Sequence, residues 1–235
     1  MTTDNETNKS AIIAGMAPGF GEALVRALAE KGFSVAGLSR TKTVDLSDLD
    51  GSYTHFECDL TDPARVEETI EAVSQEHGAP TVLIYNAMQL IPKPFLELTP
   101  EDFQSSWMAT CFGAMISARA VIPGMLAAGQ GTIIFTGATA ALKGNPRFAA
   151  FASAKFALRG LAQSLAREFG PQGVHVVHSV LDGIIWGPQA QERFNVKREN
   201  CLDATAIANS YIHLIKQSPE AWTHEFDMRP FNERF

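Results

Sequence analysis

Residues 11–32 read AIIAGMAPGFGEALVRALAEKG, an apolar run followed by a glycine-rich turn and a segment with the period of an amphipathic helix. The turn holds Gly15, Gly19 and Gly21 between the predicted strand and the predicted helix. Gly15 permits a tight turn, and the other glycines allow the backbone to approach a pyrophosphate. The helix N-terminus supplies unpaired N–H groups and the positive end of a dipole. Because strand, turn and helix occur in this order at the first crossover, the stretch favours dinucleotide binding.

The rest of the chain continues to alternate short apolar runs with segments of helical period. Predicted strands lie at 33–38, 53–59, 81–87, 131–137, 174–183 and 225–230, and predicted helices at 20–32, 62–77, 100–128 and 148–169. Strands that alternate with helices indicate a parallel sheet covered on both faces, since each parallel crossover needs a long connection. We therefore predict one α/β domain over 10–235, a doubly wound parallel sheet of about seven strands in three layers, after a flexible N-terminus at 1–9. The crossover at 41–52 has weak helical period and is expected to be irregular.

Composition excludes several classes of partner. The 235 residues are 46% hydrophobic and 19% charged, and a formal net charge of −7 without any Lys/Arg block argues against nucleic acid and anionic membrane surfaces. Cys58, Cys111 and Cys201 are widely spaced, which favours reduced thiols and predicts neither a disulfide framework nor a metal site. The polar N-terminal residues and the lack of an apolar run of about 18 residues argue against a signal peptide or membrane span. We expect a cytoplasmic protein.

Three further motifs accompany the glycine turn: CDLTD around Asp59, YNA at 85–87, and Lys155 on a predicted helix. Together they resemble the short-chain dehydrogenase/reductase family, with its Rossmann fold, over about residues 10–230. The resemblance implies that Asp59 and Leu60 lie beside the adenine of a bound cofactor. It places Asn86 and Ala87 along the adenosine ribose, Lys155 on the nicotinamide ribose, and Phe20 and Gly183 among the other cofactor contacts. As alternatives, Asp59 can cap the helix that follows, and Asn86 can serve as a turn residue.

The choice of cofactor is predicted from the end of the second strand, where Ser39 precedes Arg40. An acidic residue there would accept hydrogen bonds from a free ribose 2′-hydroxyl, whereas a hydroxyl and a cation suit a 2′-phosphate. NADP(H) is therefore favoured over NAD(H). Two observations oppose this interpretation: Arg40 can be a solvated surface charge, and Pro18 stands where many NADP-binding relatives carry a basic residue.

The catalytic positions depart from the family. Its members use Tyr-x3-Lys, a serine at the preceding strand end and an asparagine on the fourth helix for acid–base chemistry. The resemblance puts Phe151, Ala138 and Thr110 at the tyrosine, serine and asparagine positions, and only Lys155 remains. Phe151 has no proton to donate and Ala138 has no hydroxyl for an oxyanion, so we expect ordinary alcohol or ketone turnover to be almost abolished.

The strand ends that should face the nicotinamide offer replacement proton donors. Asp182, which stands where the family commonly has proline, is the best single candidate. Tyr85, His178 and Thr139 are weaker ones. Each has a structural alternative: Asp182 can cap or turn, Tyr85 and His178 can be core residues, and Thr139 can bond its own backbone.

Two functional interpretations remain open at this point. The first is an NADP(H)-dependent oxidoreductase with a small apolar or aromatic substrate in a pocket lined by Phe151, Met88 and Trp186. The second is a cofactor-binding protein without turnover, a sensor or structural subunit. A homodimer or homotetramer is also expected, because the helix at 148–166 carries an apolar face formed by Ala149, Ala152, Phe156 and Leu161.

Overall fold

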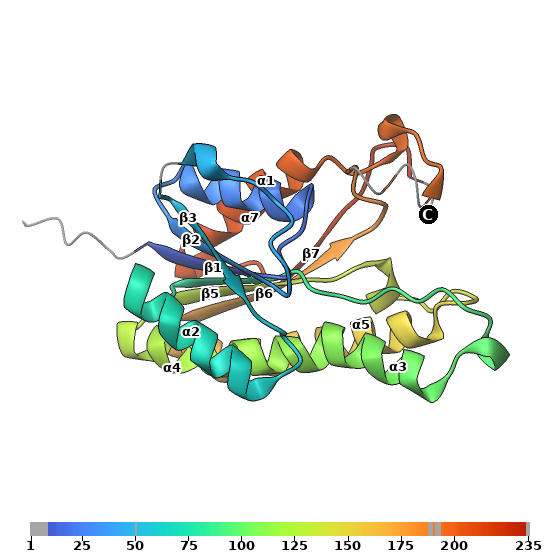
Figure 1. Cartoon of the computed structure of the whole chain (residues 1–235), viewed down its shortest axis with the longest axis horizontal. Coiled ribbons are helices and arrows are strands. Elements are labelled where there is room, and N and C mark those ends of the chain that lie inside the picture. Colours follow the sequence, from blue (N-terminus) through green and yellow to red (C-terminus); the bar gives the residue numbers. More distant parts are fainter. Residues whose placement is uncertain (1–8, 50, 188–189, 191–193, 234–235) are drawn as a thin grey trace, which may run out of the picture.

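The computed structural model describes residues 9–49, 51–187, 190 and 194–233. Seven parallel strands form one sheet in the order β3-β2-β1-β4-β5-β6-β7 (Figure 1). Their bounds are Ser10–Ala14 (β1), Ser34–Ser39 (β2), Tyr53–Glu57 (β3), Val82–Tyr85 (β4), Gly131–Thr136 (β5), Val174–Leu181 (β6) and Glu225–Met228 (β7). The predicted doubly wound parallel sheet of about seven strands is confirmed.

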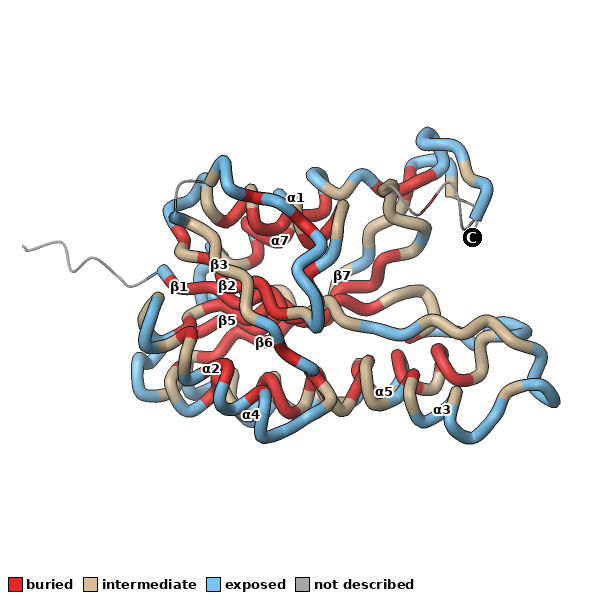
Figure 2. The backbone as a smooth tube through the Cα atoms, viewed as in Figure 1, coloured by how far each residue is buried: buried red, intermediate tan, exposed pale blue. Residues whose placement is uncertain are grey.

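Helices cover both faces of this sheet, which makes three layers (Figure 1). Helices α1 and α7 pack together on one face. Helices α2, α4 and α5 lie on the other face, and α3 packs against α5. Their bounds are Phe20–Ala29 (α1), Pro63–His77 (α2), Pro100–Trp107 (α3), Gly113–Ala128 (α4), Ala149–Phe169 (α5) and Ala204–Ile215 (α7). Strands β1, β4, β5 and β6 are buried along their whole length, and one apolar core lies on each side of the sheet (Figure 2).

The strand order fixes where a ligand can bind. Strand β1 has β2 on one side and β4 on the other, so the crossovers leave β1 in opposite directions. The connections that follow β1 and β4 therefore run to opposite faces of the sheet. They leave a crevice outside the carboxyl ends of these two strands, which is the usual ligand site of an open parallel sheet. The glycine turn after β1 opens into this crevice.

The crossover from β2 to β3 is irregular, as expected. Its described residues hold only a short 3₁₀ turn, Ser47–Leu49, tied to α1 by an ion pair between Arg26 and Asp48 at 2.6 Å. In the next crossover the helix cap is Asp62, whose carboxylate accepts from the N–H groups of Ala64 and Arg65. Capping by Asp59 was the wrong alternative, because the chain makes a further turn between Asp59 and the start of α2.

The predicted helix at 100–128 is interrupted. A π-helical turn, Met108–Phe112, joins α3 to α4 and adds a residue to the helical turn. By length and composition alone Pro100–Ala128 could cross a membrane, but half of its most apolar window is buried, and α4 packs on β4, β5 and α2. The stretch is a covering helix of this fold.

Helix α7 was not predicted from the sequence. Its N-cap Asp203 accepts from Ala206 N at 2.9 Å, and its buried face includes Ile207, Ala208 and Tyr211. The period of these residues was the available signal. Residues 1–8 of the expected flexible N-terminus lie outside the described residues, whereas Lys9 is held to the sheet by the bond from Ser34 N to its carbonyl at 2.8 Å.

The apolar face expected on α5 is less exposed than its sequence suggested. Ala152 is buried within the chain, and Ala149 and Leu161 are half-buried, so of the four residues only Phe156 is exposed. The reason is that α5 packs on α3, on β6 and on the loop before it as well as on the core. Self-association therefore stays a prediction that rests on fewer residues.

Candidate cofactor and active site

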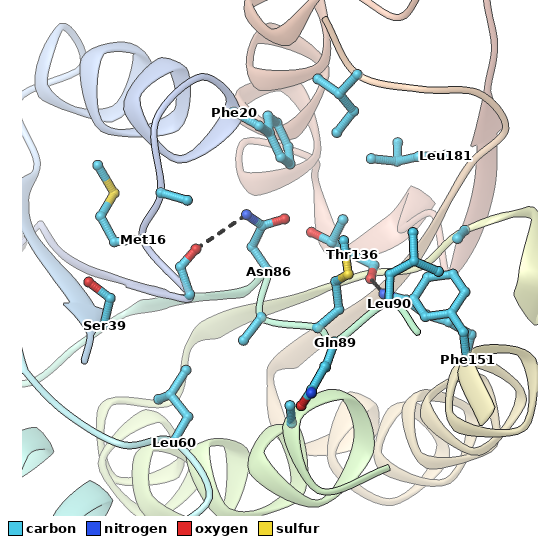
Figure 3. Close-up of a pocket in the computed structure, with 18 of the residues that line it drawn as sticks. Met16, Phe20, Ser39, Leu60, Asn86, Gln89, Leu90, Thr136, Phe151 and Leu181 are labelled. Atoms are coloured by element: carbon cyan, nitrogen blue, oxygen red, sulfur yellow. Dashed lines mark hydrogen bonds between the residues drawn. The ribbon is translucent and has the colours of Figure 1, made fainter. Parts of the chain in front are cut away.

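One cavity of about 1130 Å³ opens at the carboxyl ends of β1, β4 and β5 (Figure 3). It runs from the glycine turn past the end of β2 to the start of α5. The predicted cofactor residues that line it are Gly15, Gly19, Phe20, Ser39, Arg40, Asp59, Leu60, Asn86, Ala87, Lys155 and Gly183. The topology thus brings together residues that are far apart in the sequence.

The glycine turn forms a cradle for a phosphate group. Gly15 has a φ of 94°, and a Cβ added to it would lie 2.4 Å from Ala87 N. Gly19, with a φ of 85°, is the N-cap of α1 and provides no side-chain cap, so the first N–H groups of the helix stay available. These two features fit a dinucleotide pyrophosphate.

Gly21 has a different position from the other two glycines. It does not line the cavity but is buried in the first turn of α1, where an added Cβ would come within 3.0 Å of Met16 Sδ. Its small size therefore allows the turn to pack on the helix.

The end of the cavity that the resemblance assigns to the adenosine holds a hydroxyl, a cation and a carboxylate. Ser39 and Arg40 lie at the end of β2, and the Arg40 side chain is exposed. Asp59 Oδ1 accepts from the backbone N–H and the hydroxyl of Thr61, at 2.9 and 2.8 Å, and these bonds lower the pKa of Asp59. Asp59 therefore shapes the loop after β3 and lines the cavity at once.

Asn86 and Ala87 are held by the end of β1. Their backbone N–H groups both donate to Ala14 O, at 2.8 and 3.1 Å. The Asn86 side-chain amide donates to Gly15 O at 3.4 Å, as the dashed line in Figure 3 shows. Asn86 thus stabilises the glycine turn while it lines the cavity, so the turn role and the predicted site position occur together.

Lys155 lies at the other end of the cavity, beside the ring of Phe151. Its Nζ donates to Thr136 O at 2.6 Å and lies 5.6 Å from the centroid of Phe151 (Figure 3). Burial lowers the pKa of Lys155 to about 7, because a buried ammonium loses its hydration. Phe151 is 8% exposed and offers only the face of its ring to the ammonium.

Ala138 and Thr110, which the resemblance puts at the family's serine and asparagine positions, differ in their access to the cavity. Ala138 lines it, as does Phe151. Thr110 does not, because it lies inside the π-helical turn, whereas Met108 and Ala109 beside it face the cavity. Its hydroxyl is fully buried and has no hydrogen-bond partner among the described residues.

Asp182 lies on the wall of a second cavity, of about 530 Å³, and not on the large one. Its chain neighbours Leu181 and Gly183 line both cavities, whereas Asp182 lines only the second. The Asp182 carboxylate accepts from the Thr139 hydroxyl and lies 3.6 Å from Arg229 Nη1. Phe151 and Ala138 also border both cavities.

Tyr85 and His178 are core residues, the structural role that was the alternative to proton donation. Tyr85 is fully buried, its hydroxyl donates to Ala109 O at 2.6 Å, and burial raises its pKa. His178 is fully buried beneath Gly137, bonded through Nδ1 to Glu225 at 2.9 Å, and burial lowers its pKa to about 4. Neither side chain lines the cavity.

The expected pocket residues Met88, Phe151 and Trp186 all line the cavity. Sequence reasoning missed other lining residues on the loop after β4, on α3 and after β6, among them Gln89, Leu90, Gln104, Met108 and Ile184. Leu90 lies close to Phe151 in Figure 3. Within the described residues, no group of three His, Cys, Asp or Glu side chains is placed to hold a metal ion.

Comparisons with known proteins agree with this geometry. Residues 9–195 match the model of the family described as short chain dehydrogenase. The chain is 30% identical to L-2,3-butanediol dehydrogenase of Corynebacterium glutamicum over 189 residues, which are 76% of this chain and 72% of the relative. A solved short-chain dehydrogenase from Rhodopseudomonas palustris is 32% identical, with a TM-score of 0.82 over 95% of this chain and 99% of that one.

A third comparison shares the fold at lower identity. The NADPH-bound structure of a short chain oxidoreductase from Pseudomonas aeruginosa PAO1, described as containing an atypical catalytic center, is 22% identical. Its TM-score is 0.86 over 97% of each chain.

Proposed function

The chain belongs to the short chain dehydrogenase family of oxidoreductases, and we propose that it uses NADP(H) to act on an apolar or aromatic small molecule that needs little acid catalysis from the protein. The observation that carries this proposal is the open cavity between the glycine turn and Phe151, in which the cofactor positions and Lys155 are kept while the phenol is missing.

Each part of the cavity has a role in the proposal. The Gly15 and Gly19 turn holds the pyrophosphate, and Ser39 and Arg40 meet the 2′-phosphate. Lys155, anchored on Thr136 O, reaches the nicotinamide ribose. When bound, NADP(H) supplies or accepts a hydride at its nicotinamide ring. The P. aeruginosa relative supports this assignment, since a short chain oxidoreductase of this fold binds NADPH while it has an atypical catalytic center.

The missing hydroxyls restrict the substrate. Loss of a general acid costs about 10²–10⁴-fold in rate, and loss of an oxyanion donor costs about 10²–10³-fold. A cyclic iminium ion needs no proton when it accepts hydride at carbon. A conjugated alkene accepts hydride at its β-carbon and takes its proton from water. The apolar walls formed by Met88, Leu90 and Phe151 suit such molecules.

A binding protein without turnover is the second candidate, and the absence of hydroxyls at Phe151 and Ala138 favours it. The test is NADPH oxidation by the purified chain with aromatic iminium salts and conjugated enones, next to saturated ketones of the same size. We expect turnover with the first two classes and little with the third. Saturable NADPH binding without oxidation in any class would favour the binder.

Arg40 is expected to set the cofactor preference. Arg40→Ala removes the cation next to the 2′-phosphate and should weaken NADPH binding by about 10-fold or more, since a hydrogen bond to a charged group contributes about 1.5–3 kcal/mol. NADH binding should change little. Fluorescence titration of both cofactors measures this, with Arg167→Ala, at the far end of α5, as the control. Equal affinity of the wild type for both cofactors would contradict the preference.

Lys155 is expected to couple cofactor binding to proton uptake. At pH 8 its amine is mostly neutral, because its pKa is about 7 in the free protein. A bound phosphate-bearing ligand favours the charged amine and raises the pKa of Lys155. At pH 8 the protein should therefore take up nearly one proton for each NADPH that it binds. Calorimetric titration with NADPH in buffers of different ionisation enthalpy measures the uptake. The Lys155→Met variant should show none, and equal uptake in both proteins would contradict the assignment.

A further inference from the structure

The hydroxyl of Ser39 is held from two sides at the adenosine end of the cavity. It donates to Thr41 O at 2.9 Å, and its oxygen lies 2.9 Å from His55 Nε2. A serine hydroxyl has one hydrogen and two lone pairs. Because that hydrogen points to Thr41 O, the contact with His55 requires the imidazole to donate from Nε2.

His55 is a half-buried residue of β3 behind the lining residue Ser39. Burial and the charge of Lys42 lower the pKa of His55, with Glu57 acting in the opposite direction. The neutral ring therefore keeps a hydrogen on Nε2, directed at Ser39, and reaches the cavity only through that serine.

We propose that His55 is a positioning residue for cofactor choice: by donating to the Ser39 oxygen, it leaves the Ser39 hydrogen as the group offered to a ligand, which favours a 2′-phosphate over a 2′-hydroxyl. This inference rests on the proposed use of NADP(H). When NADP(H) binds, the Ser39 hydroxyl turns its hydrogen from Thr41 O to a phosphate oxygen, while the hydrogen bond from His55 stays in place. A phosphate oxygen is the stronger acceptor, because the hydrogen bond is then charge-assisted.

The hydrogen bond from His55 to Ser39 also limits the affinity for NADH. A ribose 2′-hydroxyl binds best to a residue with free acceptor capacity, such as a carboxylate. With one lone pair of Ser39 taken by His55, that capacity is halved. His55 thus affects the affinity for NADPH and also the ratio of the NADPH affinity to the NADH affinity. Arg40 acts differently, because it offers a cation directly to the 2′-phosphate.

The experiment measures the dissociation constants of NADPH and NADH by fluorescence titration at pH 7.5 for the wild type, His55→Leu, Ser39→Ala and the double variant. His55→Leu should lower the preference for NADPH by about 3–10-fold, the usual effect of one hydrogen bond. In the Ser39→Ala background it should have no further effect, because the two residues act on one hydroxyl.

Two further variants separate positioning from a structural effect on β3. His55→Gln keeps a side-chain N–H donor and should restore most of the preference. Thr54→Ala removes the bond from the neighbouring strand residue to Glu76, at 2.8 Å, and should leave the preference unchanged. A His55→Leu effect of the same size with and without Ser39 would overturn the inference, as would failure of His55→Gln to restore any preference.

The outcome also distinguishes this inference from the cofactor proposal. If the wild type prefers NADPH and Arg40→Ala removes that preference while His55→Leu does nothing, only the role of His55 is wrong. If the wild type shows no preference for NADPH, the proposed cofactor is wrong, and the role of His55 falls with it.

Discussion

The double variant Phe151→Tyr, Ala138→Ser should reduce aromatic ketones with NADPH about 10²–10⁴-fold faster than the wild type. Phe151 already borders the cavity, with its ring 5.6 Å from the Lys155 ammonium nitrogen. A phenol on that ring has its pKa lowered by the neighbouring ammonium and can pass a proton to the carbonyl oxygen. The Ala138→Ser change adds a hydroxyl to the same wall of the cavity, so both donors meet one oxygen.

The measurement compares NADPH oxidation by the wild type, both single variants and the double variant across a panel of aromatic ketones and aldehydes. Because the two groups act on one oxygen, the gain of the pair should exceed the sum of the single gains. Thr110→Asn is a further step, since the resemblance puts Thr110 at the family's asparagine position. The matched control is Phe148→Tyr with Ala140→Ser, which adds the same groups on the second cavity, away from Lys155. Fast ketone reduction by the wild type that these changes leave unaltered would show that another residue supplies the proton.

Gly15→Ala should reduce cofactor affinity by about 10–100-fold, because a strained backbone at the turn costs about 1–3 kcal/mol. The φ of Gly15 is 94°, and its new Cβ would lie 2.4 Å from Ala87 N and 2.6 Å from Ala87 Cα. Either the turn or the loop after β4 must move, and both line the cavity. The strained backbone should also lower the free energy of unfolding by about 1–3 kcal/mol.

The control for this change is Gly160→Ala. Gly160 lies within α5, and an added Cβ there meets no atom within 4 Å. That substitution should stabilise the chain by about 0.5–1 kcal/mol and leave NADPH binding unchanged. Titration with NADPH and thermal unfolding of both variants test the pair. Wild-type affinity in Gly15→Ala would contradict the proposed cradle.

The fold and much of the cavity lining could be predicted because they depend on residues at the ends of parallel strands. Asp59, Asn86 and Ala138 follow three different strands, and the topology brings these ends to one edge. Helix α7 was missed although its buried period is regular. The π-helical turn at Met108–Phe112 carries no pattern of its own, so the inward position of Thr110 could not be foreseen.

Side-chain direction accounts for the remaining differences. Asp182 was chosen for its carboxylate beside the expected nicotinamide site, but it lines only the second cavity, where it accepts a hydrogen bond from Thr139. Gln89 and Leu90 line the cavity from a loop, where no periodicity indicates which residue turns inward. The partner of Ser39, His55, comes from a neighbouring strand and becomes visible only when β2 and β3 are paired.

We have proposed that NADPH bound in this cavity delivers its hydride without help from a phenol. The most direct test loads the wild type with an equivalent of NADPH deuterated at the transferable position of the ring. An aromatic iminium salt, a conjugated enone or a saturated ketone is then added, and the deuterium in each product is measured by mass spectrometry. We expect deuterium on the carbon that accepts the hydride in the iminium and enone products, and almost none in the alcohol formed from the ketone. Rapid labelling of the ketone product, or no labelled product although NADPH binds, would contradict it.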